Sequence, residues 1–162
     1  MQYLLDTNAF IEAKNDYYRF SFCPGYWMWL LQKNQQQIIY SIDKIKAELL
    51  AGNDDLTEWT KKSPNELFIK PPSNLGQSLA LVAQWINSKS FTDAAKTVFF
   101  SSADYYLVAY AHSLNYTLVT RERSDPYSRK RVKIPDACLG VGVRYISPFE
   151  LMETEKANLI CD

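Results

Sequence analysis

Apolar and polar residues are arranged in a pattern that predicts strands alternating with helices. Short apolar runs of strand length occur at residues 3–5, 38–42, 67–69, 118–120 and 143–146. The run at 38–42 is continuous, which is typical of a strand covered on both faces. Between these runs, apolar residues at helical spacing form four stripes: Trp27, Leu30 and Leu31; Ile42, Ile45 and Leu49; Leu75, Leu79, Val82 and Ile86; and Leu107, Val108, Ala111 and Leu114.

The helix boundaries agree with this order. Ser101 or Ser102 is suited to cap the helix that carries Leu107, and Pro148 is suited to the first turn of a short helix over 148–152. After Thr120 we expect a polar loop before the last strand. The alternation favours a three-layer α/β/α sandwich with a mostly parallel central sheet, built as a single domain over residues 1–162.

The composition fits a folded protein without a strong overall charge. Hydrophobic residues make up 47% of the 162 residues, so a real core is expected. Lys plus Arg equals Asp plus Glu at 18 each, and any attraction to nucleic acid must therefore be local. The cysteines Cys23, Cys138 and Cys161 have no C-x-x-C spacing, and we expect reduced, mostly buried thiols.

Targeting and membrane signals are not found in the sequence. The N-terminus runs directly into an apolar segment without a basic leader, and no apolar stretch reaches transmembrane length. We therefore expect a cytoplasmic protein with no membrane partner.

Acidic residues follow the predicted strands or lie near the start of the predicted helices. Ligands of a parallel sheet bind beyond the carboxyl ends of its strands, and each following helix begins at that same edge. Asp6 follows the first strand, Glu48 is expected early in the helix after the second strand, and Asp104 lies in the first turn of its helix. Glu122 and Asp125 come after a later strand. We expect these carboxylates, the candidate catalytic residues, to share one edge.

Such a cluster points to a bound metal ion. Two unit charges about 4 Å apart repel by roughly 4 kcal/mol at an effective dielectric near 20, and a divalent cation would reverse the sign. Oxygen ligands without a converging His or Cys favour Mg²⁺ or Mn²⁺, which activate water and offset charge on a phosphoryl group. This chemistry makes a histidine base unnecessary, and the sole histidine, His112, lies in mid-helix. The side chains of Thr7, Asn8, Ser102 and Thr120 are placed to orient the carboxylates.

Each acid also has a purely structural explanation. Asp6 would cap the next helix, Asp104 would stabilise a helix N-terminus, and Glu48 would be a solvated helix residue. Of Glu122 and Asp125, the one that does not bind metal would be an ordinary loop residue. The combination of acids therefore carries the hypothesis.

A basic segment follows Thr120. Residues 121–133 hold six cations against Glu122 and Asp125, a local charge of six minus two, or plus four. Tyr127 in this segment is available to stack a base. With Tyr127, the candidate RNA-binding residues are Arg121, Arg123, Arg129, Lys130, Arg131 and Lys133. A solvated loop or a docking surface for a protein partner would explain the segment equally well.

Four segments of the chain resemble motifs of PIN-domain nucleases. They occur in the order that the family shows and span nearly the whole chain. Each motif is short, so the resemblance depends on the set. The four segments are residues 3–8 (YLLDTN), 41–49 (SIDKIKAEL), 103–109 (ADYYLVA) and 118–122 (LVTRE). Residues 145–148 (YISP) also fit the pattern.

Two further segments narrow the resemblance. Residues 22–27 (FCPGYW) and 132–138 (VKIPDAC) are similar to a little-characterised branch of PIN-like proteins. That branch departs from the commoner pattern in its longer first connection and its elaborated loop after Thr120.

The resemblance implies a VapC-like ribonuclease, often the toxin of a type II toxin–antitoxin pair. It implies that Asp6, Glu48 and Asp104 are metal ligands and that Glu122 is the fourth. Asp125 matches another usual position of the fourth acid, and Asp136 is a further candidate. RNA is then the substrate, Mg²⁺ or Mn²⁺ the cofactor, and a cognate antitoxin the expected partner, while analogy with the family favours a homodimer.

Two other functions remain open. A phosphoryl-transfer protein on a similar α/β fold also places an Asp after the first strand. Haloacid-dehalogenase-like proteins, however, carry a D-x-D-x-T motif, and the segment Asp6-Thr7-Asn8 lacks the second Asp of that motif. A non-catalytic PIN-like scaffold would serve protein contacts, and the full set of acids argues against it. Nucleotide-binding enzymes with Gly-rich loops are disfavoured, because the five glycines form no such loop.

Overall fold

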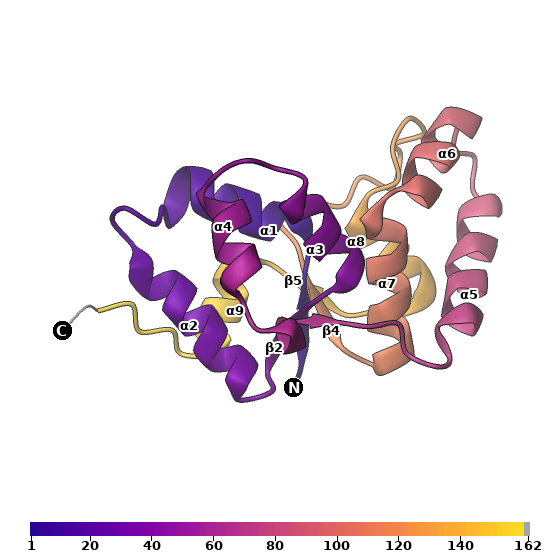
Figure 1. Cartoon of the computed structure of the whole chain (residues 1–162). Helices are drawn as coiled ribbons and strands as arrows, with labels where there is room; N and C mark the ends of the chain where they lie inside the picture. Colours follow the sequence, from indigo (N-terminus) through magenta and orange to yellow (C-terminus); the bar gives the residue numbers. More distant parts are fainter. Residues whose placement is uncertain (161–162) are drawn as a thin grey trace.

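A five-stranded parallel sheet forms the centre of the molecule (Figure 1). The computed structural model describes residues 1–160, so Cys161 lies outside the described part of the chain. The strands are β1 (Tyr3–Leu5), β2 (Ile39–Ile42), β3 (Phe68–Ile69), β4 (Thr117–Val119) and β5 (Tyr145–Ile146), in the order β3-β2-β1-β4-β5. All neighbouring pairs are parallel, which confirms the predicted α/β/α fold.

The central strand is β1, and its three residues are buried. Its neighbours are fixed by register, with Tyr3 opposite Ile39 of β2 and Leu5 opposite Val119 of β4. A strand covered on both faces must be apolar throughout, which explains the sequence YLL. The residues that follow β1 and β4 therefore leave the sheet side by side at its carboxyl edge.

Helices cover both faces of the sheet. Figure 1 shows α5, α6 and α7 on one side and α1, α2 and α4 on the other. The helical segments are α1 (Thr7–Glu12), the π-helical turn η1 (Ala13–Tyr17), α2 (Pro24–Gln35), α3 (Asp43–Leu50), α4 (Asp55–Lys62), the 3₁₀ turn η2 (Asn65–Leu67), α5 (Leu75–Asn87), α6 (Asp93–Ser101), α7 (Ala103–Leu114), α8 (Ile134–Val141) and α9 (Pro148–Thr154). Within residues 1–160, none of these helices has the length and apolar character needed to cross a bilayer.

Helices α4, α6 and α8 were not predicted from the sequence. Helices α4 and α6 begin at the side-chain caps of Asp54 and Thr92, and both carry many polar residues on their exposed faces. Helix α8 lies inside the segment that the sequence predicted as a polar loop. It packs Ile134, Ala137 and Cys138 into the core, so the loop prediction is wrong beyond residue 133.

The thiols of the described residues behave as the sequence predicted. Cys23 and Cys138 are free, and Cys138 is fully buried. Burial in apolar surroundings raises the pKa of the Cys138 thiol, so it stays protonated at neutral pH.

Candidate active site

Asp6 is the first residue after β1 and the N-cap of α1. Only 1% of its surface is exposed. Its Oδ1 accepts a hydrogen bond of 2.6 Å from the Ala9 backbone N–H, and its Oδ2 accepts one of 2.7 Å from Thr120 Oγ1. The capping explanation of Asp6 is therefore confirmed, and the same carboxylate also lies buried at the centre of the carboxyl edge.

The surroundings of Asp6 oppose its ionisation. Burial raises its pKa to about 7, while the hydrogen bonds from Thr120 and Ala9 act in the opposite direction. The neighbouring negative charges of Asp104 and Glu122 raise it further. Capping a helix does not by itself require a raised pKa, because an Asp that caps an exposed helix end ionises in contact with water.

Asp104 lies in the first turn of α7, as predicted. Burial raises its pKa to about 6, and the charges of Glu122 and Glu48 add to this shift. Arg131 opposes it, and no hydrogen bond from residues 1–160 stabilises the ionised form. Asp104 is thus a partly buried carboxylate whose oxygens are available to a ligand.

Glu48 reaches the same region from α3. It is the sixth of the eight residues of that helix and exposed, so the prediction that it lies early in the helix is wrong. Its Oε2 accepts a hydrogen bond of 2.6 Å from Thr7 Oγ1. This contact joins α3 to the first turn of α1 and directs the carboxylate toward the edge where Asp6 lies.

Glu122 also lies within electrostatic reach of Asp6 and Asp104. Its side chain is only 8% exposed, and both carboxylate oxygens have partners. Oε1 lies 2.5 Å from Arg131 Nη2, and Oε2 accepts a hydrogen bond of 2.8 Å from the backbone N–H of Ile134, the first residue of α8. Glu122 therefore holds the basic segment and the start of α8 in place.

The other two candidates for the fourth acid lie in a different setting. Asp136, in the first turn of α8, is buried and accepts hydrogen bonds from Ser124 Oγ and from the Asp125 backbone N–H, the latter at 2.9 Å. It is an anchor for the loop. Asp125 is exposed and lines a cavity with Trp85 and Tyr127, so the structure does not bring it to the Asp6 cluster.

The four residues predicted to orient the carboxylates divide into two pairs. Thr7 and Thr120 do donate to Glu48 and Asp6. Ser102 instead donates to the Phe99 carbonyl at 2.7 Å, and Asn8 is exposed without a side-chain hydrogen bond to any residue of the described chain.

His112 has a structural partner away from the acids. Its Nδ1 lies 2.8 Å from Ser78 Oγ of α5. It follows Asp104 by eight residues of α7, or about 12 Å along the helix axis. The prediction that His112 is not catalytic stays a prediction.

The predicted RNA-binding cations lie in different surroundings. Arg121 Nη1 lies 2.9 Å from Glu12 Oε2, and its guanidinium lies 4.6 Å from the centroid of the Tyr17 ring. Lys130 and Arg131 line a hollow of about 330 Å³ together with Asp104. Two cations thus lie directly beside a candidate catalytic carboxylate.

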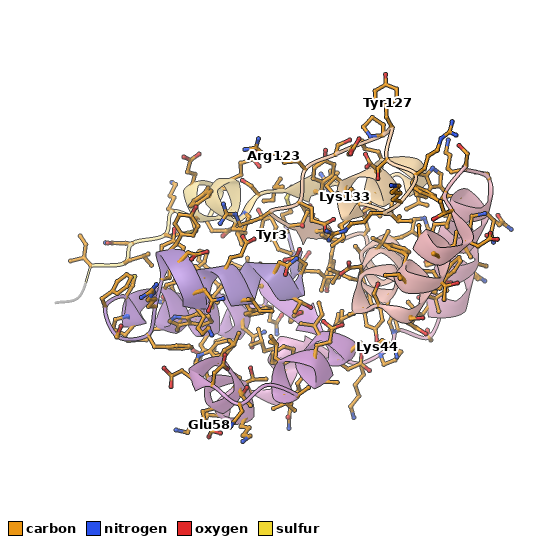
Figure 2. The ribbon with its side chains drawn as sticks, turned by 90° about the horizontal axis from the view of Figure 1, so that it is seen from above. Tyr3, Lys44, Glu58, Arg123, Tyr127 and Lys133 are labelled. Carbon is orange, nitrogen blue, oxygen red and sulfur yellow. The ribbon has the colours of Figure 1, made fainter. Side chains whose placement is uncertain are left out.

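Figure 2 views the molecule from above, the side toward which the strands of Figure 1 run. Arg123, Tyr127 and Lys133 lie along one side of this view, and Tyr127 projects away from the body of the molecule. Lys44 lies on the opposite side. Its Nζ is 4.1 Å from the centroid of the Tyr106 ring. The sequence analysis missed this contact, although Lys44 is only the second residue after β2.

The donor chemistry at this edge fits a hard divalent cation. Among residues 1–160, no three His, Cys, Asp or Glu side chains are close enough to hold a metal ion by themselves. Mg²⁺ does not need such a cage, because it is commonly bound through one or two carboxylates, several waters and substrate phosphates. Asp6 and Asp104 are two oxygen donors with raised pKa values, and the charges of Glu48 and Glu122 increase the attraction for a cation.

Comparison with known proteins identifies a family. The family model described as "Domain of unknown function (DUF4411)" matches residues 3–159, nearly the whole chain. No match was found among the curated proteins. The function must therefore be argued from the site.

Proposed function

The chain belongs to the DUF4411 family, and we propose that it is a metal-dependent endoribonuclease that hydrolyses RNA phosphodiester bonds. The observation that carries the proposal is the pair Asp6 and Asp104. Two carboxylates from distant parts of the chain lie partly or fully buried at the same sheet edge, where burial raises the pKa of both and the negative charge of Asp104 adds to the shift of Asp6. A fold keeps such an unfavourable arrangement when a ligand offsets it.

Asp6 and Asp104 would hold Mg²⁺ or Mn²⁺, with Glu48 and Glu122 as neighbouring charges. When bound, such an ion supplies Lewis acidity that activates a water and offsets charge on the phosphodiester. The donor set favours this class of ion because the side chains that meet there offer oxygen atoms.

The protein's own residues orient the site and bind the substrate. Thr120 and the Ala9 N–H fix the two oxygens of Asp6, and Thr7 fixes Glu48. Lys130 and Arg131, in the hollow beside Asp104, are positioned to bind phosphate oxygens. Cations next to the carboxylates favour a polyanionic substrate over a neutral one, which supports RNA.

The resemblance of the four sequence segments to PIN-domain nucleases extends the proposal to a biological role. We propose a VapC-like toxin of the cytoplasm, paired with a small antitoxin and acting as a homodimer. This role predicts an adjacent gene for a small DNA-binding protein and growth arrest when the chain is expressed alone. Growth without arrest, together with no such neighbour, would favour a housekeeping nuclease.

The direct test is cleavage of a fluorescently labelled, unstructured RNA by the purified protein. Cleavage should require Mg²⁺ or Mn²⁺, stop in EDTA, and fall at least about 100-fold in Asp104→Asn, the loss typical of removing a charge-stabilising group. Asp93→Asn is the matched control, because Asp93 also lies in the first turn of a helix and is exposed. Cleavage that persists in EDTA, or an active Asp104→Asn, would overturn the chemistry proposed here.

A further inference from the structure

A second cavity lies between α5, α8 and the loop that follows β4. Its volume is about 570 Å³, within the usual range of small-ligand sites. Its lining includes three aromatic rings, Trp85, Phe91 and Tyr127, and two cations, Lys89 and Arg129. Two carboxylates, Asp125 and Asp136, also line it, and Asp136 is engaged by hydrogen bonds from Ser124 and the Asp125 backbone. None of these seven residues takes part in the Asp6 cluster.

Trp85 and Phe91 form one wall of the cavity, which we call the aromatic wall, and neighbouring groups hold it in place. The rings of Trp85 and Phe91 have centroids 5.9 Å apart at an interplanar angle of 60°. On the α8 side, a Cβ at Gly140 would lie 2.1 Å from Trp85 Nε1, so the indole rests directly on the backbone at that position. Only glycine allows this approach, and it fixes the indole where it faces the cavity.

Tyr127 is among the residues that line the cavity, and its side chain is 92% exposed and projects away from the body of the molecule (Figure 2). Its loop is nevertheless held firmly, because Asp136 accepts hydrogen bonds from Ser124 and from the Asp125 backbone N–H. A large ring presented to solvent on an anchored loop, at the same cavity as two partly buried rings, is available for stacking. Isolated exposed rings need no such anchor.

The cavity adjoins the hollow beside Asp104. Arg129 lines the cavity, and the next two residues, Lys130 and Arg131, line the hollow. Consecutive Cα atoms are about 3.8 Å apart, so the two sites are neighbours along one short stretch of chain. The Arg129 carbonyl accepts a hydrogen bond of 2.9 Å from the Thr92 N–H, which ties this stretch to the start of α6.

We propose that the cavity binds an unpaired base of the RNA strand whose phosphodiester lies at Asp6 and Asp104. The inference rests on the ribonuclease proposal and adds where the neighbouring nucleotide is held. Unpaired RNA bases are recognised by stacking on aromatic side chains, and phosphates beside them by Arg and Lys. The cavity supplies both kinds of group, with Lys89 and Arg129 at hand for the backbone of the same strand.

The proposal predicts that the aromatic rings of the cavity contribute to RNA binding even when the protein cannot cleave the RNA. The probe is a 12-nucleotide, fluorescein-labelled RNA of mixed sequence without secondary structure. Binding is measured by fluorescence anisotropy with full-length protein carrying Asp104→Asn, in Mg²⁺, and a gel confirms that the RNA stays intact. Removing one stacking ring should weaken binding about 5-fold to 100-fold.

Tyr127→Ala is the decisive variant, because its ring is so exposed that its loss leaves the core unchanged. Trp85→Leu tests the opposite wall, and its thermal melting curve must match that of the background protein. Phe22→Ala is the matched control, since that ring is 62% exposed and belongs to the segment before α2. Arg129→Ala removes a cation of the cavity, and Arg144→Ala is its control for the loss of one positive charge. Arg144 is exposed and precedes β5 at the amino edge of the sheet.

The outcomes separate the two proposals. Weaker binding in Tyr127→Ala and Trp85→Leu, with unchanged binding in Phe22→Ala, supports the base site. Equal binding in all variants overturns the base site and leaves the ribonuclease standing. A background protein that binds no RNA also overturns the base site, while cleavage by the wild-type protein decides the ribonuclease separately.

Discussion

Thr120 Oγ1 donates a hydrogen bond of 2.7 Å to Asp6 Oδ2, and both residues are buried. The contact joins the residue after β4 to the residue after β1, two neighbouring strands of the sheet. It also opposes the effect of burial on the Asp6 pKa more strongly than any other contact. Thr120 thus keeps Asp6 oriented and closer to its ionised form.

The first prediction concerns this hydroxyl. Thr120→Val keeps the shape of the side chain and removes the donor, so the pKa of Asp6 should rise further. Affinity for Mn²⁺ at pH 7 should fall about 10-fold to 100-fold, as is typical when a partner of a metal ligand is lost. Titration of Mn²⁺ by electron paramagnetic resonance measures this, and Thr120→Ser, which retains a hydroxyl, should stay near wild type. Equal affinity in the Val variant would show that Asp6 is not a ligand.

The second prediction concerns the pH dependence of stability without metal. The folded-state pKa values of Asp6 and Asp104 are raised to about 7 and about 6, above the usual value for Asp of about 3.9. Between about pH 4 and 7 the folded protein therefore binds more protons than the unfolded chain. Its free energy of unfolding should decrease as the pH rises through this window.

Urea denaturation in EDTA measures this effect. The midpoint should be higher at pH 5 than at pH 8. The free energy of unfolding should differ by about 4 kcal/mol, because pH 5 lies about two units below the folded-state pKa of Asp6 and about one unit below that of Asp104, and each unit corresponds to about 1.4 kcal/mol. Asp6→Asn should flatten the profile while keeping α1 capped, because Asn is as good an N-cap as Asp. A wild-type protein whose stability rises toward pH 8 would contradict the burial and charge described for these groups.

The third prediction is stabilisation by metal. Binding that relieves carboxylate repulsion in the folded state adds about 1.4 kcal/mol at ten times the dissociation constant. For a chain of this size the melting temperature should then rise by about 3–5 °C. The shift at pH 8 should exceed that at pH 5.5, because Asp6 and Asp104 must lose their protons to bind.

Differential scanning fluorimetry with Mn²⁺ provides the measurement. Asp104→Asn should abolish the shift, and Asp93→Asn should retain it. An unchanged shift in Asp104→Asn would place the ion elsewhere.

The sequence predicted the parts of the site that depend on local pattern. Asp6 follows a short apolar run, and Asp104 lies two residues after Ser102, which occupies the N-cap position of α7 without a side-chain cap hydrogen bond, so strand end and helix start were both visible. The expectation that the acids share one edge of the sheet follows from the parallel topology. Among the carboxylates of residues 1–160, these two are the ones whose pKa values burial raises.

The remaining parts depend on contacts distant in sequence. Glu122 was predicted as a metal ligand. Its hydrogen-bond partners, however, are Arg131 and the Ile134 N–H, which lie nine and twelve residues later in the chain. The aromatic wall pairs Trp85 of α5 with a backbone position of α8, which no helical pattern indicates. Helix α8 itself was missed because Pro135 and Asp136 are typical of loops, although here they form its first turn.

The last prediction decides what Glu122 does. Both of its oxygens accept hydrogen bonds, from Arg131 and from the Ile134 N–H, and the side chain is buried. Glu122→Gln replaces one acceptor with an amide donor that faces another donor. In EDTA this variant should lose about 1–3 kcal/mol of unfolding free energy, the penalty of an unpaired buried group. Arg131→Ala should lose less, because Arg131 is largely exposed and the bond to Ile134 survives. If Glu122→Gln instead keeps full stability in EDTA and loses Mn²⁺ affinity, then Glu122 is a metal ligand and its bonds to the loop are secondary.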